Sequence, residues 1–220
     1  MNVFPPDGFH HRCVHGILSC MAKPRPPPGS NQPVPDADTL HEAALAYLGK
    51  YAATKAMLER VLRRRVERWA RKARMAAPEN AAEIASRVAD AKRAVREIVT
   101  RLAASGAVDD AAWAANRTRR LLRTGRSRRA VEAYLAAQGV DPETARAVLP
   151  VSEEGELSAA LVLARRRRIG PFREKSPDAA GLQRELSVLA RAGFSRTVAT
   201  KALGMDPGEA EALLTELRQR

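Results

Sequence analysis

The acidic pair Asp109-Asp110 is the first place where two neighbouring side chains of this sequence could do chemistry together. Adjacent carboxylates can act as an acid and a base, or bind a metal ion. This pair comes directly before a helical pattern, where a short carboxylate accepts hydrogen bonds from free backbone N–H groups and contributes about 1 kcal/mol. The sequence therefore favours helix capping over catalysis.

Histidine and cysteine near the N-terminus form a second candidate group. The residues that could ligate a metal there are His10, His11, Cys13, His15 and Cys20. Their spacing matches no standard zinc pattern, and the body of the chain adds no second pair of ligands. Met21 is an alternative start, which would remove this set. His41 has no Ser or Cys motif for which it could act as a general base. We expect no metal, no cofactor and no enzymatic activity.

Arginine clusters form the third group, and their chemistry is anion binding. The chain has 38 Lys and Arg against 25 Asp and Glu, a formal net charge of +13. A chain this basic attracts polyanions, so nucleic acid or an acidic protein surface is the expected partner, with a solvated face as the alternative for each cluster. The candidate binding residues are Arg63, Arg64, Arg68, Arg117, Arg119, Arg120, Arg123, Arg126, Arg128, Arg129, Arg165, Arg166, Arg167 and Arg168.

Two of these arginines occupy an unfavourable position. Ser127 is a predicted helix cap, which places Arg128 and Arg129 in the first turn of the following helix. Cations near a helix N-terminus cost about 0.3–1 kcal/mol. An anionic partner would relieve that cost, so the pair hints at a binding function.

The elements that carry these residues are predicted to be helices. Aromatic residues are few, the long Val, Ile and Thr runs of a sheet are missing, and apolar residues recur at spacings of three and four. Order is expected to begin near Asp38, with Thr39 and Glu42 as a capping box and Leu45 on the apolar face. A longer helix from about Ala53 breaks at Pro78, and helix resumes from about Ala81 to Ser105.

The second half of the chain alternates helix starts and stops. Gly106, Gly125, Gly139, Gly170-Pro171, Gly193 and Gly204 are the predicted stops. The predicted starts are Ser127, Asp141-Pro142, Ser152, Asp178 with Leu182 on its apolar face, Ser195 and Asp206-Pro207. Residues 1–35 are rich in Pro, Gly and polar residues, and we expect a disordered tail.

An internal repeat organises this pattern. Leu135 and Gly139 match Leu189 and Gly193, and the match continues without a gap to Leu149 and Leu203. We therefore expect an all-α fold, an elongated, right- or left-curved array of tandem three-helix repeats. The predicted parts are a tail over 1–37, repeat 1 with a basic extension over 38–107, repeat 2 over 108–150, and repeat 3 plus a C-terminal helix over 151–220.

An ordered set of anchors in this array resembles a known family. The anchors are Ala44-Leu45-x-Tyr47-Leu48, Gly106-x-x-Asp109-Asp110-x-x-Trp113-Ala114, Gly125 with Arg128-Arg129, Gly139-Val140 and Leu189-x-x-x-Gly193-Phe194-Ser195. Over about residues 38–204 they resemble the RecX family of bacterial recombination regulators. The basic, alanine-rich extension after the second helix departs from the family pattern, which has a compact glycine turn there.

The resemblance implies a non-enzymatic modulator of the RecA recombinase. Such a protein would bind the groove of the RecA–DNA filament, reduce ATP hydrolysis, strand exchange and coprotease activity, and contact single- or double-stranded DNA through basic faces. It would be a cytoplasmic monomer acting in homologous recombination, DNA repair and the SOS response. The sequence has no apolar run of about 18 residues, which predicts no membrane span.

The alternative is a basic helical DNA-binding protein of the helix-turn-helix type. Gln138-Gly139-Val140 and Ala192-Gly193-Phe194 both resemble turns between two short helices. A recognition helix presents polar side chains to base edges. Residues 143–149 offer mostly Glu, Ala and Val, whereas the helix after Ser195 offers Arg196, Thr197, Thr200 and Lys201.

Overall fold

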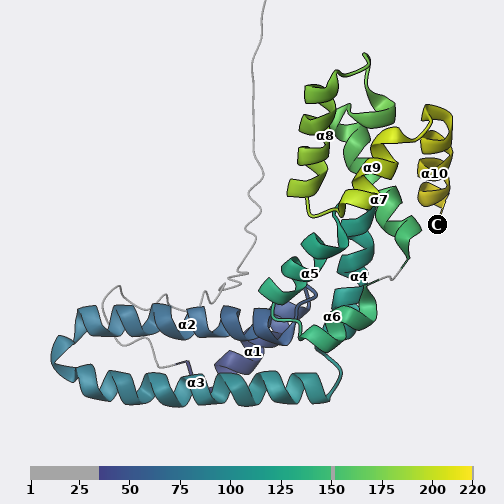
Figure 1. Cartoon of the computed structure of the whole chain (residues 1–220). Helices are drawn as coiled ribbons and strands as arrows, with labels where there is room; N and C mark the ends of the chain where they lie inside the picture. The colour runs from purple at the N-terminus through teal and green to yellow at the C-terminus, as the bar shows by residue number, and fades with distance from the viewer. Residues whose placement is uncertain (1–34, 150–151, 220) are drawn as a thin grey trace, which may run out of the picture. The chain divides into compact units, whose positions relative to one another are not determined.

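The chain is helical throughout the part that the structure describes. The computed structural model describes residues 35–149 and 152–219, and in these ranges it contains ten α-helices, two short 3₁₀ helices and no strand (Figure 1). The all-α prediction is therefore confirmed. Most of the expected tail, and the histidine and cysteine set within it, lie outside the described residues. No helix among the described residues is long and apolar enough to cross a membrane.

The first group of helices is built around a long hairpin. Its elements are α1 (Ala37–Leu48), α2 (Lys55–Ala76), the 3₁₀ turn η1 (Pro78–Asn80) and α3 (Ala81–Ala104). α2 and α3 run side by side in Figure 1, joined by η1 where Pro78 interrupts the helical pattern. Their facing stripes, with Leu62 and Val66 on α2 and Val88 and Val95 on α3, form one apolar core with Leu40 of α1. The amphipathic spacing of both helices thus leaves their basic residues outside.

The start of α1 differs from its prediction. Asp36 is the N-cap, and its carboxylate accepts a hydrogen bond from the Thr39 N–H at 2.8 Å. The capping box of Thr39 and Glu42 is therefore wrong, because a carboxylate three residues earlier already occupies the capping position. Leu45, predicted on the apolar face, is 48% exposed, since this 12-residue helix buries only a narrow face at Leu40 and Ala44.

The middle group contains α4 (Asp110–Arg123), α5 (Arg128–Ala137) and α6 (Pro142–Val148). Its small core joins all three helices through Ala114, Val131, Leu135, Val140 and Ala145. Ser127 and Asp141 cap α5 and α6 as predicted, accepting from the N–H groups three residues on at 3.2 and 2.8 Å. The Thr144 hydroxyl and N–H also hold the pKa of the Asp141 carboxyl below its ordinary value.

The last group surrounds α7 (Glu153–Arg167). Its other elements are η2 (Gly170–Phe172), α8 (Ala179–Arg191), α9 (Arg196–Gly204) and α10 (Pro207–Gln219). Leu161 of α7, Leu189 of α8 and Leu214 of α10 are buried in one apolar core, to which α9 also contributes. α7 ends before the predicted Gly170-Pro171 stop, because Arg168 takes the left-handed conformation with φ 54°. Leu182, predicted as an apolar-face residue, is 42% exposed.

The leucines matched in the sequence repeat are buried alike in the middle and last groups. Leu135 and Leu189 are both fully buried, and Leu149 and Leu203 are 3% and 4% exposed. Each pair occupies the same place relative to a helix end, so the gap-free match reflects the same core-facing positions.

Candidate nucleic-acid interface

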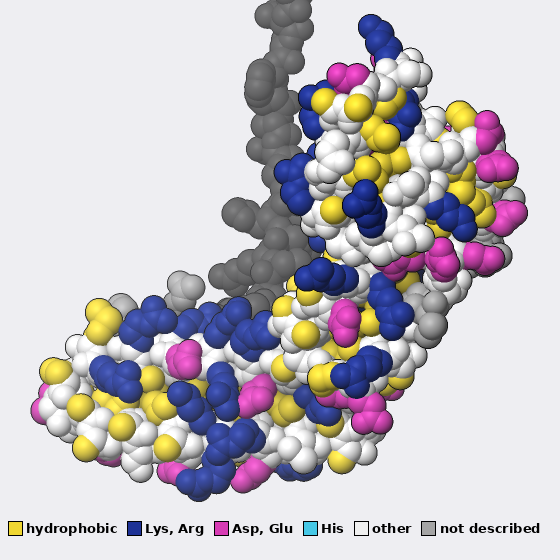
Figure 2. All heavy atoms as spheres, in the orientation of Figure 1, with side chains coloured by type: hydrophobic (Ala, Val, Ile, Leu, Met, Phe, Trp, Pro, Cys, Tyr) yellow, Lys and Arg dark blue, Asp and Glu magenta, His cyan; other side chains and the backbone are white. Residues whose placement is uncertain are grey.

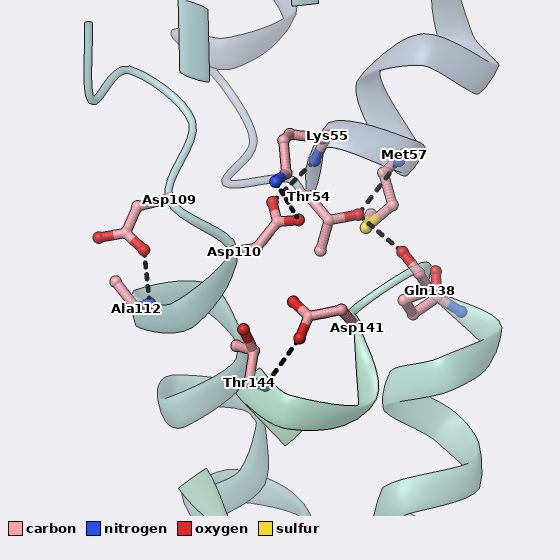
Figure 3. Close-up of polar contacts among 9 residues, drawn as sticks. All are labelled: Thr54, Lys55, Met57, Asp109, Asp110, Ala112, Gln138, Asp141 and Thr144. Carbon is pink, nitrogen blue, oxygen red and sulfur yellow. Dashed lines mark hydrogen bonds and ion pairs between the residues drawn. The ribbon is translucent and has the colours of Figure 1, made fainter. Parts of the chain in front are cut away.

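Helix ends meet at two junctions between the helical groups, and the first junction is between α5 and α2. The Thr54 hydroxyl, at the N-cap of α2, accepts from the Met57 N–H at 3.1 Å and donates to the carbonyl of Gln138 at 2.7 Å (Figure 3). Gln138 is the C-cap of α5. The positive end of one helix dipole thus meets the negative end of another through a single hydroxyl.

Asp109 and Asp110 have different roles at this junction, because their carboxylates accept from N–H groups of different helices. Asp109 caps α4, accepting from the Ala112 N–H at 2.9 Å, as predicted. Asp110 instead accepts from the backbone N–H of Lys55 at 2.8 Å, and the Lys55 Nζ lies 3.8 Å from its carboxylate (Figure 3). The interpretation of both residues as caps of their own helix is therefore wrong for Asp110. It caps α2, which lies 55 residues away in sequence.

The second junction, between α8 and α5, repeats the first. The Ser127 hydroxyl donates to the carbonyl of Ala192 at 2.6 Å, and the Glu156 carboxylate accepts from the Arg128 N–H at 3.1 and 3.2 Å. Thr54 and Asp110 at one junction thus correspond to Ser127 and Glu156 at the other. At both junctions, the hydroxyl at the N-cap of one helix donates to a carbonyl at the C-terminal end of another. A carboxylate from a third helix accepts from the first N–H of the helix that the hydroxyl caps.

Glu156 also accounts for the cations at the start of α5. Its half-buried carboxylate supplies the negative charge that the Arg128-Arg129 turn was expected to take from a partner. Burial raises the pKa of Glu156, and the N–H and charge of Arg128 act in the opposite direction. The anion at this helix start thus belongs to the chain itself, and binding of a partner by Arg128 and Arg129 stays a prediction.

Asp110→Ala is expected to lower the free energy of unfolding by about 1–3 kcal/mol, because it leaves a part-buried N–H at the start of α2 without its acceptor. Asp110→Asn is the matched control, since it keeps an acceptor oxygen and loses only the charge. Urea unfolding monitored by circular dichroism measures both. Equal losses for the two variants would show that the charge, and not the hydrogen bond, stabilises the junction.

On the middle group, most of the predicted arginines are exposed. The exposed members are Arg119, Arg120, Arg123, Arg126 and Arg129. Arg117 differs, because its guanidinium lies over the Tyr134 ring at 4.9 Å, and that ring stacks on Trp113 with centroids 6.4 Å apart. Arg117 therefore holds α4 against α5, and it is less available to a partner than its neighbours.

On α7, the run from Arg165 to Arg168 does not form a single face. Arg165 pairs with Glu211 at 3.6 Å and Arg168 with Glu174 at 3.8 Å, whereas Arg166 and Arg167 are exposed and have no carboxylate at ion-pair distance among the described residues. The turn between α4 and α5 lies against α7, since a Cβ at Gly125 would be 3.0 Å from the Leu163 nitrogen. The arginines that follow Gly125 and Leu163 thus belong to adjoining elements.

The three candidates on α2 belong to the hairpin. Arg63 pairs with Glu59 at 2.7 Å, whereas Arg64 and Arg68 are exposed on the outer side of the helix. Figure 2 shows basic side chains spread over this hairpin and over the other helical groups. No group of three His, Cys, Asp or Glu side chains in residues 35–149 and 152–219 is placed to hold a metal ion.

Comparison with curated proteins finds relatives that share one description. The chain is 36% identical over 171 residues to "Regulatory protein RecX" of Myxococcus xanthus, an alignment that covers 76% of this chain and 86% of that protein. It is 39% identical over 110 residues to the protein of the same description from Agrobacterium fabrum, and 39% identical over 112 residues to that from Mycobacterium ulcerans. These two alignments cover 59% and 62% of the relatives. No family model matches the chain, and neither does any solved structure.

Proposed function

This chain belongs to the RecX family of regulatory proteins, and from that premise we propose that it modulates the RecA recombinase without catalysing a reaction of its own. It binds in the groove of the RecA–DNA filament and lowers ATP hydrolysis, strand exchange and coprotease activity. The observation that carries the proposal is the 36% identity to a RecX protein across 86% of that relative's length.

The helical groups support a modular way of binding. We take the three apolar cores, joined by two similar junctions, as three tandem three-helix repeats. They cover about 38–107, 108–150 and 151–220, and the last range also contains the C-terminal helix α10. A repeating array can present a similar surface to successive subunits of a helical filament. Each repeat carries exposed arginines, and Arg123 and Arg126 lie on both sides of the turn that packs on α7. We expect a cytoplasmic monomer that acts in homologous recombination, DNA repair and the SOS response.

The test is RecA ATPase on single-stranded DNA with increasing amounts of the purified full chain. We expect ATP hydrolysis to fall as the chain co-sediments with the filament. Arg123→Gln with Arg126→Gln should raise the concentration needed for inhibition by about two- to thirtyfold, since each exposed charged contact is worth about 0.2–1 kcal/mol. Arg87→Gln with Arg93→Gln removes the same charge from α3 and serves as the control. Unchanged hydrolysis at saturating protein, together with no co-sedimentation, rejects the proposal.

One observation favours sequence-specific DNA binding as a second candidate. α9 follows a tight turn, and its polar residues Arg196, Thr197, Thr200 and Lys201 are all exposed. Polar side chains on one short helix can read base edges in a major groove. Selection from a library of random duplexes tests this candidate, and recovery of unrelated sequences would reject it.

A further inference from the structure

The outer face of α2 carries cations that the fold does not use. Arg64, Arg68, Arg71 and Lys72, here called the α2 stripe, are exposed: Arg68 follows Arg64 by four residues, and Arg71 and Lys72 follow Arg68 by three and four. They therefore share one side of the helix, opposite the buried Leu62, Val66 and Trp69. Like charges at these spacings destabilise a helix, so the stripe gives the fold no stability of its own.

Internal contacts distinguish the stripe from Arg87 and Arg93 of α3 and from Arg60 of α2. Arg87 pairs with Glu83 on α3, and Arg93 with Asp90 at 3.1 Å. At the base of α2, Arg60 donates to the carbonyl of Ala137 at 3.4 Å. Within the described residues, no carboxylate lies at ion-pair distance from any member of the stripe. Its charge is therefore available to a partner.

We propose that the α2 stripe is a binding site for the phosphate backbone of double-stranded DNA, independent of base sequence and separate from the arginines on α4, α5 and α7. Three of its four members are arginine, whose planar fork binds phosphate through two parallel hydrogen bonds. Members four residues apart are separated by about 6 Å along the helix, close to the roughly 6.8 Å of two axial steps in a DNA strand.

The chemistry of the hairpin favours duplex over single-stranded DNA. Proteins that hold single strands stack the bases on aromatic side chains. Trp69 is the only aromatic residue between Lys55 and Ala104, and it is 9% exposed and packed in the apolar core. The hairpin therefore offers charge without a stacking surface. Duplex DNA has the higher density of phosphates, about one per 1.7 Å against one per 3.4 Å for a single strand.

The experiment measures binding of the full chain to a labelled duplex of mixed sequence, without RecA, at several salt concentrations. Arg64→Gln with Arg68→Gln is compared with Arg87→Gln with Arg93→Gln, a control that removes two charges from the same hairpin. We expect the first pair to weaken duplex binding by about tenfold or more at 0.1 M salt and to reduce the salt slope by about 2. The control pair should leave the slope unchanged.

Three outcomes would overturn the proposal. They are equal effects of the two pairs, no effect of either, and a loss confined to single-stranded DNA. If the first pair lowers the melting temperature, the single change Arg68→Gln is used in its place. The expected reduction of the salt slope of duplex binding is then about 1. Because RecA is left out, failure here does not affect the proposed function, and an absent ATPase effect does not affect this site.

Discussion

Replacing Gly139 by alanine is expected to lower the free energy of unfolding by about 2–4 kcal/mol, a large part of the stability of a small protein. Gly139 has φ +79°, a left-handed conformation that costs an L-residue about 1–2 kcal/mol. A Cβ at this position would also lie 2.2 Å from the Cβ of Ala56, well inside van der Waals contact. The new methyl group therefore pushes α5 away from the start of α2, where the Thr54 hydroxyl meets the Gln138 carbonyl.

Gly106→Ala is the matched control for this effect. Gly106 has nearly the same backbone conformation, φ +75°, and nothing within 4 Å of the added Cβ. It should lose only the backbone contribution, so the difference between the two variants in urea unfolding measures the clash at the junction. If both variants lose the same free energy of unfolding, the junction accommodates the added methyl group and does not hold the two helices in a fixed position.

The affinity for single-stranded DNA is expected to fall roughly 10²–10⁴-fold between 50 and 200 mM salt. Neutralising each phosphate releases a counterion, and six to ten contacts to a single strand give a slope of about −0.7 per contact. The exposed arginines that have no carboxylate partner among the described residues are numerous enough to make such contacts. They include Arg120, Arg123, Arg126, Arg129, Arg166 and Arg167.

Fluorescence anisotropy of a labelled oligonucleotide, titrated at several salt concentrations, measures this slope. Arg166→Gln with Arg167→Gln should reduce this salt slope by about 1.4. Arg165→Gln with Arg168→Gln should change the slope less, because these two arginines already pair with Glu211 and Glu174. A flat response to salt in the unaltered chain would contradict phosphate binding by these clusters.

Local chemistry explains why most helix boundaries could be predicted from the sequence. A Ser or Asp side chain that caps a helix contacts a backbone N–H only three residues away, as at Ser127, Asp141, Asp178 and Ser195. The prediction at Thr39 was wrong for an equally local reason, since the Asp36 carboxylate accepts from the Thr39 N–H that the Glu42 side chain would take in a capping box. Exposure at Leu45 and Leu182 could not be predicted, because the width of a buried face depends on which helices pack there.

The helical class, the core-facing leucines of the repeat and the arginine clusters could be predicted from the sequence, because each depends on residues close along the chain. The roles of the charged side chains follow only from the folded arrangement of the helices. Asp110 and Glu156 cap helices other than their own, across 55 and 28 residues, so both carboxylates serve to hold helices together. The same folding pairs some arginines with carboxylates and leaves others exposed. Whether a charge finds a partner within the chain depends on which helix ends meet in space, and no local pattern encodes that.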